Sequence, residues 1–190
     1  MSDERRASFH LRDAAGDDIP EITQIYGHYV RTSCFTFEET APPPDEMRAR
    51  WRKVRETGLP WRVAAASDGA VIGYAYAAPF RPRSAYRYTV ENSVYIDPKR
   101  VGGGAGTALM RDLIGECTAL GYRQMIAVIG DSANEGSFRL HTRLGFRTIG
   151  HQLAVGLKFG RWVDVVQMQL ALGDGARSVP AGEPIGYVRR

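Results

Sequence analysis

The stretch YIDPKRVGGGAGTALM, residues 95–110, joins an apolar run to the first turn of a helix through five consecutive small residues, 102–106. Glycine loses more conformational entropy on folding than any other residue, so a cluster of glycines indicates a backbone requirement. A glycine-rich turn that opens a helix leaves several N–H groups unpaired, and the helix dipole adds partial positive charge there. No carboxylate occurs between Gly102 and Arg111. The composition of this turn therefore predicts a site for an anion such as a pyrophosphate.

The spacing of the glycines argues against two common nucleotide-binding loops. A Walker A loop ends in Gly-Lys-Ser/Thr, and no Gly-Lys pair occurs in this chain. A dinucleotide-binding turn needs G-x-G-x-x-G, but its last position here is Thr107 or Leu109. The pattern that fits is G-x-G-x-G, with glycines at 102, 104 and 106. On this pattern alone, a surface loop that binds nothing stays open as an alternative.

Around this turn, strand-like and helix-like patterns follow one another in an order typical of a mixed α/β or α+β domain. A length of 190 residues fits one well-cored domain. We expect an N-terminal extension over 1–8, one domain over 9–172 and a disordered, turn-rich tail over 173–190. Residue spacing predicts helices over about 19–32, 45–57, 105–120 and 134–144, and strands over 9–13, 61–66, 71–77, 89–96, 124–130, 146–157 and 162–170.

Charge and hydropathy narrow the class of protein. The net charge is +4, but the 25 basic residues are interleaved with 21 acidic ones and no block of Lys and Arg occurs. This distribution suits a small anionic ligand, and we predict no nucleic-acid partner. No apolar run is long enough to span a membrane, and the N-terminus has no apolar core of a secretory signal. We therefore predict a cytoplasmic protein without a membrane partner.

Three motifs resemble one known family. VYIDPKRVGGGAGTALM (94–110) resembles motif A of the GCN5-related N-acetyltransferases (GNAT), and NEGSFRLHTRLGF (134–146) resembles the helix that follows it in that superfamily. YRYTVENSVYI, AVIGDSANEGSFRLHTRLGF and VGLKFGRWVDVVQMQL are similar to the phosphinothricin and methionine sulfoximine acetyltransferase branch. The resemblance covers about 9–172. It implies a mixed, mostly antiparallel sheet with a central β-α-β unit and flanking helices.

The resemblance implies that acetyl-CoA is the co-substrate and that no metal is needed. The loop would hold the pyrophosphate through main-chain amides, and the strand before it would bind the pantetheine arm. One departure is Val101, where the family usually has Gln or Arg; Arg100 lies one residue earlier. The cofactor-binding residues implied are Ser93, Val94, Tyr95, Ile96, Val101, Gly102, Gly103, Gly104, Ala105, Gly106, Asn134 and Ser137.

Acetyl transfer to an amine requires a base for the ammonium and a proton for the leaving thiolate. Glu91 is the lone carboxylate of the run TVENSVYI, and partial burial would raise its pKa toward a useful range. Both this argument and the resemblance make Glu91 the candidate base; the alternative is a solvated strand Glu. His141 lies two helical turns after Asn134, so both can share a face. We take His141 as a candidate acid or base, the alternative being a helix-surface or capping residue.

The resemblance further implies a small amino-acid-like acceptor, of the phosphinothricin or methionine sulfoximine type, and a homodimer. Arg81 is the candidate partner for an anionic group of the acceptor, because guanidinium forms bidentate ion pairs. Another amine or amino acid as acceptor stays open, as does a non-catalytic acyl-CoA-binding module. Candidate acceptor-binding residues are Thr36, Phe37, Phe80, Arg81, Pro82, Val90, Glu91, Asn92 and Lys158. In a dimer, Lys158 and Trp162 of the final hairpin turn would reach the active site of the partner subunit.

Overall fold

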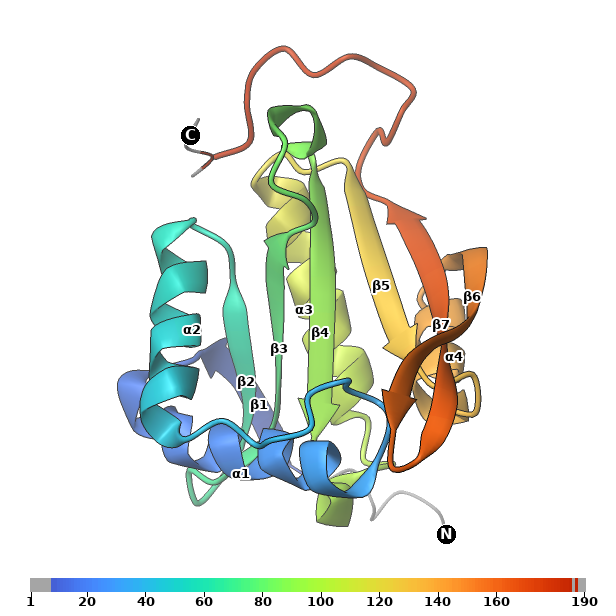
Figure 1. The fold of residues 1–190 in the computed structure, drawn as a ribbon. Helices are drawn as coiled ribbons and strands as arrows, with labels where there is room; N and C mark the ends of the chain where they lie inside the picture. Colours follow the sequence, from blue (N-terminus) through green and yellow to red (C-terminus); the bar gives the residue numbers. More distant parts are fainter. Residues whose placement is uncertain (1–7, 186, 188–190) are drawn as a thin grey trace, which may run out of the picture.

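The computed structural model describes residues 8–185 and 187. Within these residues the strands form one sheet in the order β1-β2-β3-β4-β5-β7-β6, in which β4 and β5 pair in parallel and all other neighbours are antiparallel (Figure 1). This confirms the predicted mixed, mostly antiparallel sheet. The strands are β1 (Phe9–Asp13), β2 (Trp61–Ala66), β3 (Val71–Pro79), β4 (Thr89–Ile96), β5 (Gln124–Gly130), β6 (Arg147–Lys158) and β7 (Arg161–Ala171).

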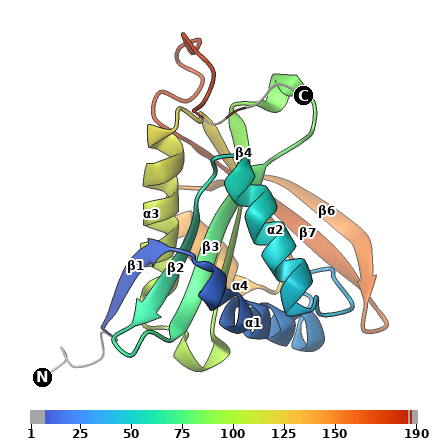
Figure 2. The same ribbon diagram turned by 90° about the vertical axis from the view of Figure 1, so that its left-hand side faces the viewer.

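Helices cover both faces of the sheet. They are α1 (Ile19–Thr32), α2 (Pro44–Glu56), α3 (Ala105–Ala119) and α4 (Glu135–Arg143). Figures 1 and 2 show α1 and α2 on one face and α3 on the opposite face. The helix predicted from about Asp45 begins one residue earlier, at Pro44, because proline is well suited to the first helical position. Short 3₁₀ turns, which the sequence patterns did not reveal, occupy Gly16–Asp18, Ser84–Tyr86 and Pro98–Arg100.

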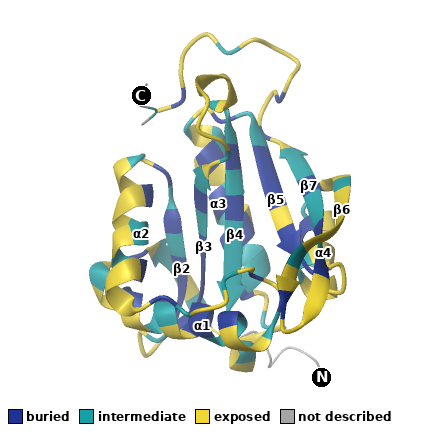
Figure 3. Ribbon diagram, viewed as in Figure 1, coloured by how far each residue is buried: buried dark blue, intermediate teal, exposed yellow. Residues whose placement is uncertain are grey.

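The apolar core lies on both sides of the central strands (Figure 3). On α3, Leu109, Leu113 and Cys117 are fully buried, and on α1 the same is true of Ile19, Ile22 and Val30. Helical spacing of these residues produces one apolar face on each helix, which the sheet covers. Side chains of β6, at the free edge of the sheet, are mostly exposed. No helix among the described residues is long and apolar enough to cross a membrane.

The segment from residue 173 onward departs from the predicted disordered tail. The N–H of Ile185 donates to the Leu120 carbonyl (2.8 Å), and the Tyr88 hydroxyl donates to the Gly182 carbonyl (2.9 Å). Pro184 is buried. The prediction of disorder rested on the small number of apolar side chains in this segment. The contacts that hold the segment against the domain are largely made by backbone groups, which amino-acid composition does not reveal. Residues 186 and 188–190 of the tail, and 1–7 of the N-terminal extension, lie outside the described residues.

Candidate active site

The glycine-rich turn connects β4 to α3. The 3₁₀ turn that ends at Arg100 leads into residues Gly102 and Gly104, which both have φ of +87°. A side chain added at either position would meet nothing within 4 Å, so glycine is required there by backbone conformation rather than by space. Gly104 is the N-cap of α3, and the first turn of α3 contains no acidic residue. The turn therefore leads into a helix N-terminus without a competing carboxylate, and anion binding there stays a prediction.

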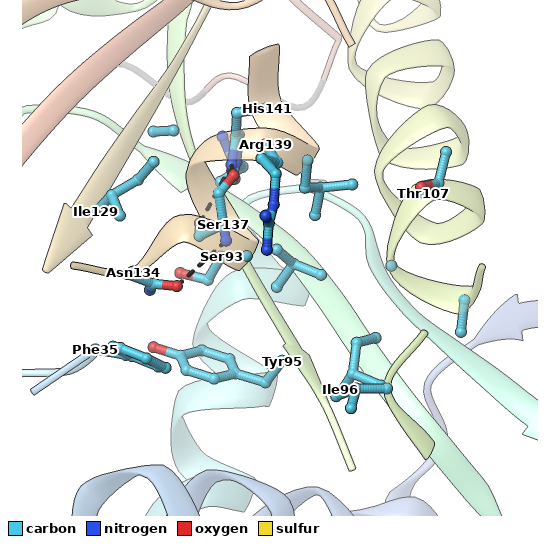
Figure 4. Close-up of a pocket in the computed structure, with 18 of the residues that line it drawn as sticks. Phe35, Ser93, Tyr95, Ile96, Thr107, Ile129, Asn134, Ser137, Arg139 and His141 are labelled. Carbon is cyan, nitrogen blue, oxygen red and sulfur yellow. Dashed lines mark hydrogen bonds between the residues drawn. The ribbon is translucent and has the colours of Figure 1, made fainter. Parts of the chain in front are cut away.

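Next to this turn, β4 and β5 separate. Their parallel pairing runs from Thr89↔Gln124 to Asn92↔Ala127 and then ends, although β4 continues to Ile96 and β5 to Gly130. A cavity of about 480 Å³ occupies the resulting fork. Figure 4 shows side chains from β4, β5, the start of α3 and α4 around this cavity. A slot of this kind exposes the unpaired edges of two strands to a ligand.

The cavity brings together most of the predicted cofactor-binding residues. Ser93, Val94, Tyr95 and Ile96 form one side, the turn from Val101 to Gly106 forms one end, and Asn134 and Ser137 come from α4. Gly103 does not line the cavity. Val101 is exposed, and Arg100 also lines the cavity.

Several lining residues were not predicted. Tyr29 and Phe35 come from the end of α1 and the segment after it, and Arg139 and Arg143 come from α4. The two arginines are four residues apart in a helix, a spacing that places side chains on one face. This spacing is visible in the sequence and could have indicated that both arginines lie beside the turn and add positive charge there. Tyr29 and Phe35 left no comparable signal, since they lie more than fifty residues from the turn.

Alternation along β4 places the predicted residues on opposite faces of the sheet. Tyr95 contacts the rings of Tyr26 and Tyr29 of α1, so Tyr95, and with it Glu91 in the same period-two series, faces α1 and α2. Asn92 contacts His141 of α4, and Val90 joins Asn92 on that side. Among the predicted acceptor residues, the side chains of Val90 and Asn92 are therefore separated from Glu91 by the sheet itself.

Glu91 is half-buried and lies opposite Ala78 of β3. Burial raises the pKa of Glu91 above its ordinary value, and the nearby positive charge of Arg81 partly offsets this rise. Glu91 comes one residue before Asn92, which is the first residue of β4 that lines the cavity. A carboxylate with a raised pKa next to a slot is well placed to accept a proton from a group bound at the slot's mouth.

Asn134, Ser137 and His141 form one line along α4. The Asn134 side chain accepts a hydrogen bond from the Ser137 N–H (3.2 Å) and so caps the start of this helix, while its predicted contact with the cofactor stays a prediction. His141 is 2% exposed, and burial lowers its pKa, although the Ser137 carbonyl opposes this. Its Nε2 lies 3.0 Å from Asn92 Oδ1 and its Nδ1 lies 2.8 Å from the Ser137 carbonyl oxygen (Figure 4 shows His141 above Ser137). Both ring nitrogens are thus engaged inside the protein.

The remaining acceptor candidates come from two loops. Phe80, Arg81 and Pro82 lie on the loop between β3 and β4, where the Arg81 guanidinium sits 5.0 Å from the centre of the Phe80 ring. Thr36 and Phe37 lie between α1 and α2. Lys158 is 3% exposed, and its Nζ donates to the Thr36 carbonyl at 2.8 Å. Within one chain, Lys158 therefore supports the loop that carries Thr36, a contact across 122 residues of sequence.

No three His, Cys, Asp or Glu side chains within 8–185 and 187 lie close enough together to hold a metal ion. The cavity suits a ligand with an anionic group, because its lining includes the N-terminus of α3 and the side chains of Arg100, Arg139 and Arg143.

Comparison with known proteins defines the class. Residues 25–146 match the model of the Acetyltransferase (GNAT) family. The chain belongs to this acetyltransferase family, as the motifs had indicated, and it is therefore an N-acetyltransferase by class.

Individual relatives narrow the branch. Phosphinothricin N-acetyltransferase of Alcaligenes faecalis is 49% identical over 92% of this chain and 88% of its own length. An L-methionine sulfoximine/L-methionine sulfone acetyltransferase of Pseudomonas paraeruginosa is 41% identical over 91% of this chain and 99% of its own. Among solved structures, a phosphinothricin acetyltransferase from Sinorhizobium meliloti in complex with AcCoA superposes with a TM-score of 0.90, at 46% identity over 93% of this chain and 95% of that one. These similarities confirm the predicted branch resemblance.

Proposed function

We propose that this protein transfers an acetyl group from acetyl-CoA to the amino group of a small amino-acid analogue, of the phosphinothricin or methionine sulfoximine type. The observation that carries this proposal is the fork between β4 and β5, with the glycine turn at one end and Glu91 beside it on the α1/α2 face. The names of the relatives support the choice of acceptor. Such an activity detoxifies an inhibitor of this type, and its dependence on acetyl-CoA fits the predicted cytoplasmic location.

Different residues bind acetyl-CoA and accept the proton of the acceptor. The turn from Val101 to Gly106 and the start of α3 hold the pyrophosphate, and the free edge of β4 from Ser93 to Ile96 holds the pantetheine arm. Glu91, directly or through a water, takes one proton from the acceptor's ammonium. The freed amine forms a bond to the thioester carbonyl carbon as the bond from carbon to sulfur breaks. The second proton of the amine ends on the departing thiolate.

Main-chain N–H groups stabilise the negative charge that develops on the thioester carbonyl oxygen. Beyond Asn92 the edge of β4 is no longer paired with β5, so an N–H near Val94 is available to that oxygen. The predicted acid or base role of His141 stays a prediction. Both of its ring nitrogens are engaged by other protein groups.

A thiol-release assay tests the acceptor. Purified protein would receive acetyl-CoA with phosphinothricin, methionine sulfoximine, methionine sulfone and a panel of ordinary amino acids and amines. We expect release of CoA with the first three at a kcat/KM at least about 100-fold above that for the ordinary amines, because a site built around an ion pair rejects acceptors that lack the matching group. Efficient acetylation of the ordinary amines alone would contradict the proposed acceptor, and tight acetyl-CoA binding without any release would contradict transfer itself.

We further propose that the chain forms a homodimer through the hairpin of β6 and β7. β6 is an edge strand of the sheet, and an edge strand offers unpaired N–H and C=O groups to another chain. Large apolar side chains are exposed on this hairpin, which is unusual for a surface that stays in water. They are Ile149, Leu153, Val155, Leu157, Phe159 and Trp162.

For this interface we expect Leu153→Asp to shift the protein toward a monomer at micromolar concentration, because a buried unpaired carboxylate is strongly unfavourable. Leu153 is 69% exposed in the single chain. Val179→Asp is the matched control, since Val179 is an apolar residue that is 93% exposed outside the hairpin. Light scattering coupled to size-exclusion chromatography measures the mass. A wild-type monomer, or an equal effect of both substitutions, would contradict the proposed interface.

A further inference from the structure

Asn92 occupies the point at which β4 and β5 separate. It forms the last pair of the parallel ladder, with Ala127, and it is 6% exposed. Its side-chain Nδ2 donates a hydrogen bond to the main-chain oxygen of Ile126 at 3.0 Å, across the two strands. The side chain of Asn92 therefore joins β4 to β5 at the last pair before the two strands separate.

The other end of the same amide faces His141. Asn92 Oδ1 lies 3.0 Å from His141 Nε2. Because Nδ2 is committed to a carbonyl oxygen, Oδ1 is left as an acceptor, and Nε2 of His141 must carry a proton to pair with it. Turning the amide around would place Oδ1 against the Ile126 oxygen, two acceptors without a proton between them. The surroundings of Asn92 thus select the orientation of its amide and the protonation of Nε2.

Ser137 completes the chain of contacts at Nδ1. Its hydroxyl oxygen lies 3.3 Å and its carbonyl oxygen 2.8 Å from His141 Nδ1. The hydroxyl can donate to an unprotonated Nδ1, and the carbonyl can accept from a protonated one. The shorter contact, to the carbonyl oxygen, favours a proton on Nδ1, and the bond from Nε2–H to Asn92 is the same whether or not Nδ1 carries that proton. The N–H of Ser137 in turn reaches the Asn134 side chain at the start of α4.

From this continuous chain, which runs from Asn134 through Ser137, His141 and Asn92 to Ile126, we infer that Asn92 and His141 are positioning residues. Together they fix where the slot begins and hold α4 against it, and neither carries a proton to or from the reacting atoms. Both side chains lie on the α4 face of the sheet, opposite Glu91, and the ring of His141 directs no free nitrogen into the cavity. The inference rests on the proposed function only in naming the slot as the acetyl-CoA site.

A set of variants separates positioning from proton transfer. In His141→Gln, the side-chain amide can donate to Asn92 as Nε2–H does, but it cannot titrate. We expect His141→Ala to weaken acetyl-CoA binding about 10-fold, in both Kd and KM, with little change in the acceptor KM, and His141→Gln to restore most of this loss. A 10-fold change corresponds to about 1.4 kcal/mol. Asn92→Ala should match His141→Ala, and the double variant should be no worse than either, because both remove the same hydrogen bond.

Thr142→Ala, an exposed position on the same helix, is the control and should bind acetyl-CoA as wild type does. Titration calorimetry gives the Kd without any acceptor, so it reports on the inference even if transfer fails in the acceptor panel. Nitrogen NMR of the imidazole should show a protonated Nε2. The inference is overturned if His141→Gln is as slow as His141→Ala and loses a limb of the pH profile, if the Ala variants bind acetyl-CoA normally, or if Nε2 is unprotonated.

Discussion

Replacement of Glu91 by Gln is expected to lower kcat at pH 7 by about 100- to 10,000-fold, the range that a positioned general base contributes. Glutamine keeps the shape of the side chain but cannot accept the ammonium proton. Glu91 lies on the α1/α2 face, whereas the cavity lining begins at Asn92, so the Kd for acetyl-CoA should stay near that of wild type. Single-turnover kinetics together with calorimetry measure the two quantities separately.

The pH profile of the wild-type enzyme gives an independent measure of the same group. The base works only when deprotonated, so kcat/KM should rise as pH increases through the pKa of Glu91. Because burial raises that pKa, this acidic limb should lie above the ordinary Glu value of about 4.3. The exposed Glu116 on α3 supplies the control substitution, Glu116→Gln, which should leave the limb in place. A Glu91→Gln enzyme as fast as wild type would remove Glu91 from the mechanism.

The glycine-rich turn and the order of helices and strands could be predicted from the sequence, because both depend on local rules. Gly102 and Gly104 adopt positive φ as a glycine turn requires, and Asn134 caps α4 where a polar residue precedes a helical pattern. These features need only a few neighbouring residues to be specified. Glu91 could likewise be singled out from its neighbours alone, because it is the one carboxylate of an otherwise neutral strand.

Contacts between segments far apart in the sequence could not be predicted from local rules. Lys158 reaches Thr36 within the same chain, and Asn92 bonds Ile126 and His141, because the fold brings separate elements together. Alternation within a strand, by contrast, is a local rule, because adjacent side chains such as those of Val90, Glu91 and Asn92 point to opposite faces in turn. Applied to β4, this alternation separates the α1/α2 face with Glu91 from the α4 face with Asn92.

Arg81→Ala is expected to raise the KM for the acceptor about 10- to 100-fold and to leave the KM for acetyl-CoA nearly unchanged. A hydrogen bond to a charged group is worth about 1.5–3 kcal/mol, which corresponds to this range. Arg81 lies on the loop before β4 and does not line the cavity of the fork, so its loss should act on the acceptor alone. Arg83→Ala in the same loop is the matched control and should have a much smaller effect.

The Arg81→Ala enzyme should also differ from wild type in its pH dependence. The positive charge of Arg81 lowers the pKa of Glu91, while burial raises it. Removing that charge leaves the effect of burial unopposed, so the pKa of Glu91 should rise further and the acidic limb of kcat/KM should move to higher pH. A full pH series of kcat/KM, which reports the free enzyme, distinguishes this shift from weaker binding, because weaker binding alone lowers the whole profile without moving its limb. If KM rises but the limb stays where it is in wild type, Arg81 binds the acceptor without acting on Glu91; if neither changes, the acceptor's anionic group is bound elsewhere.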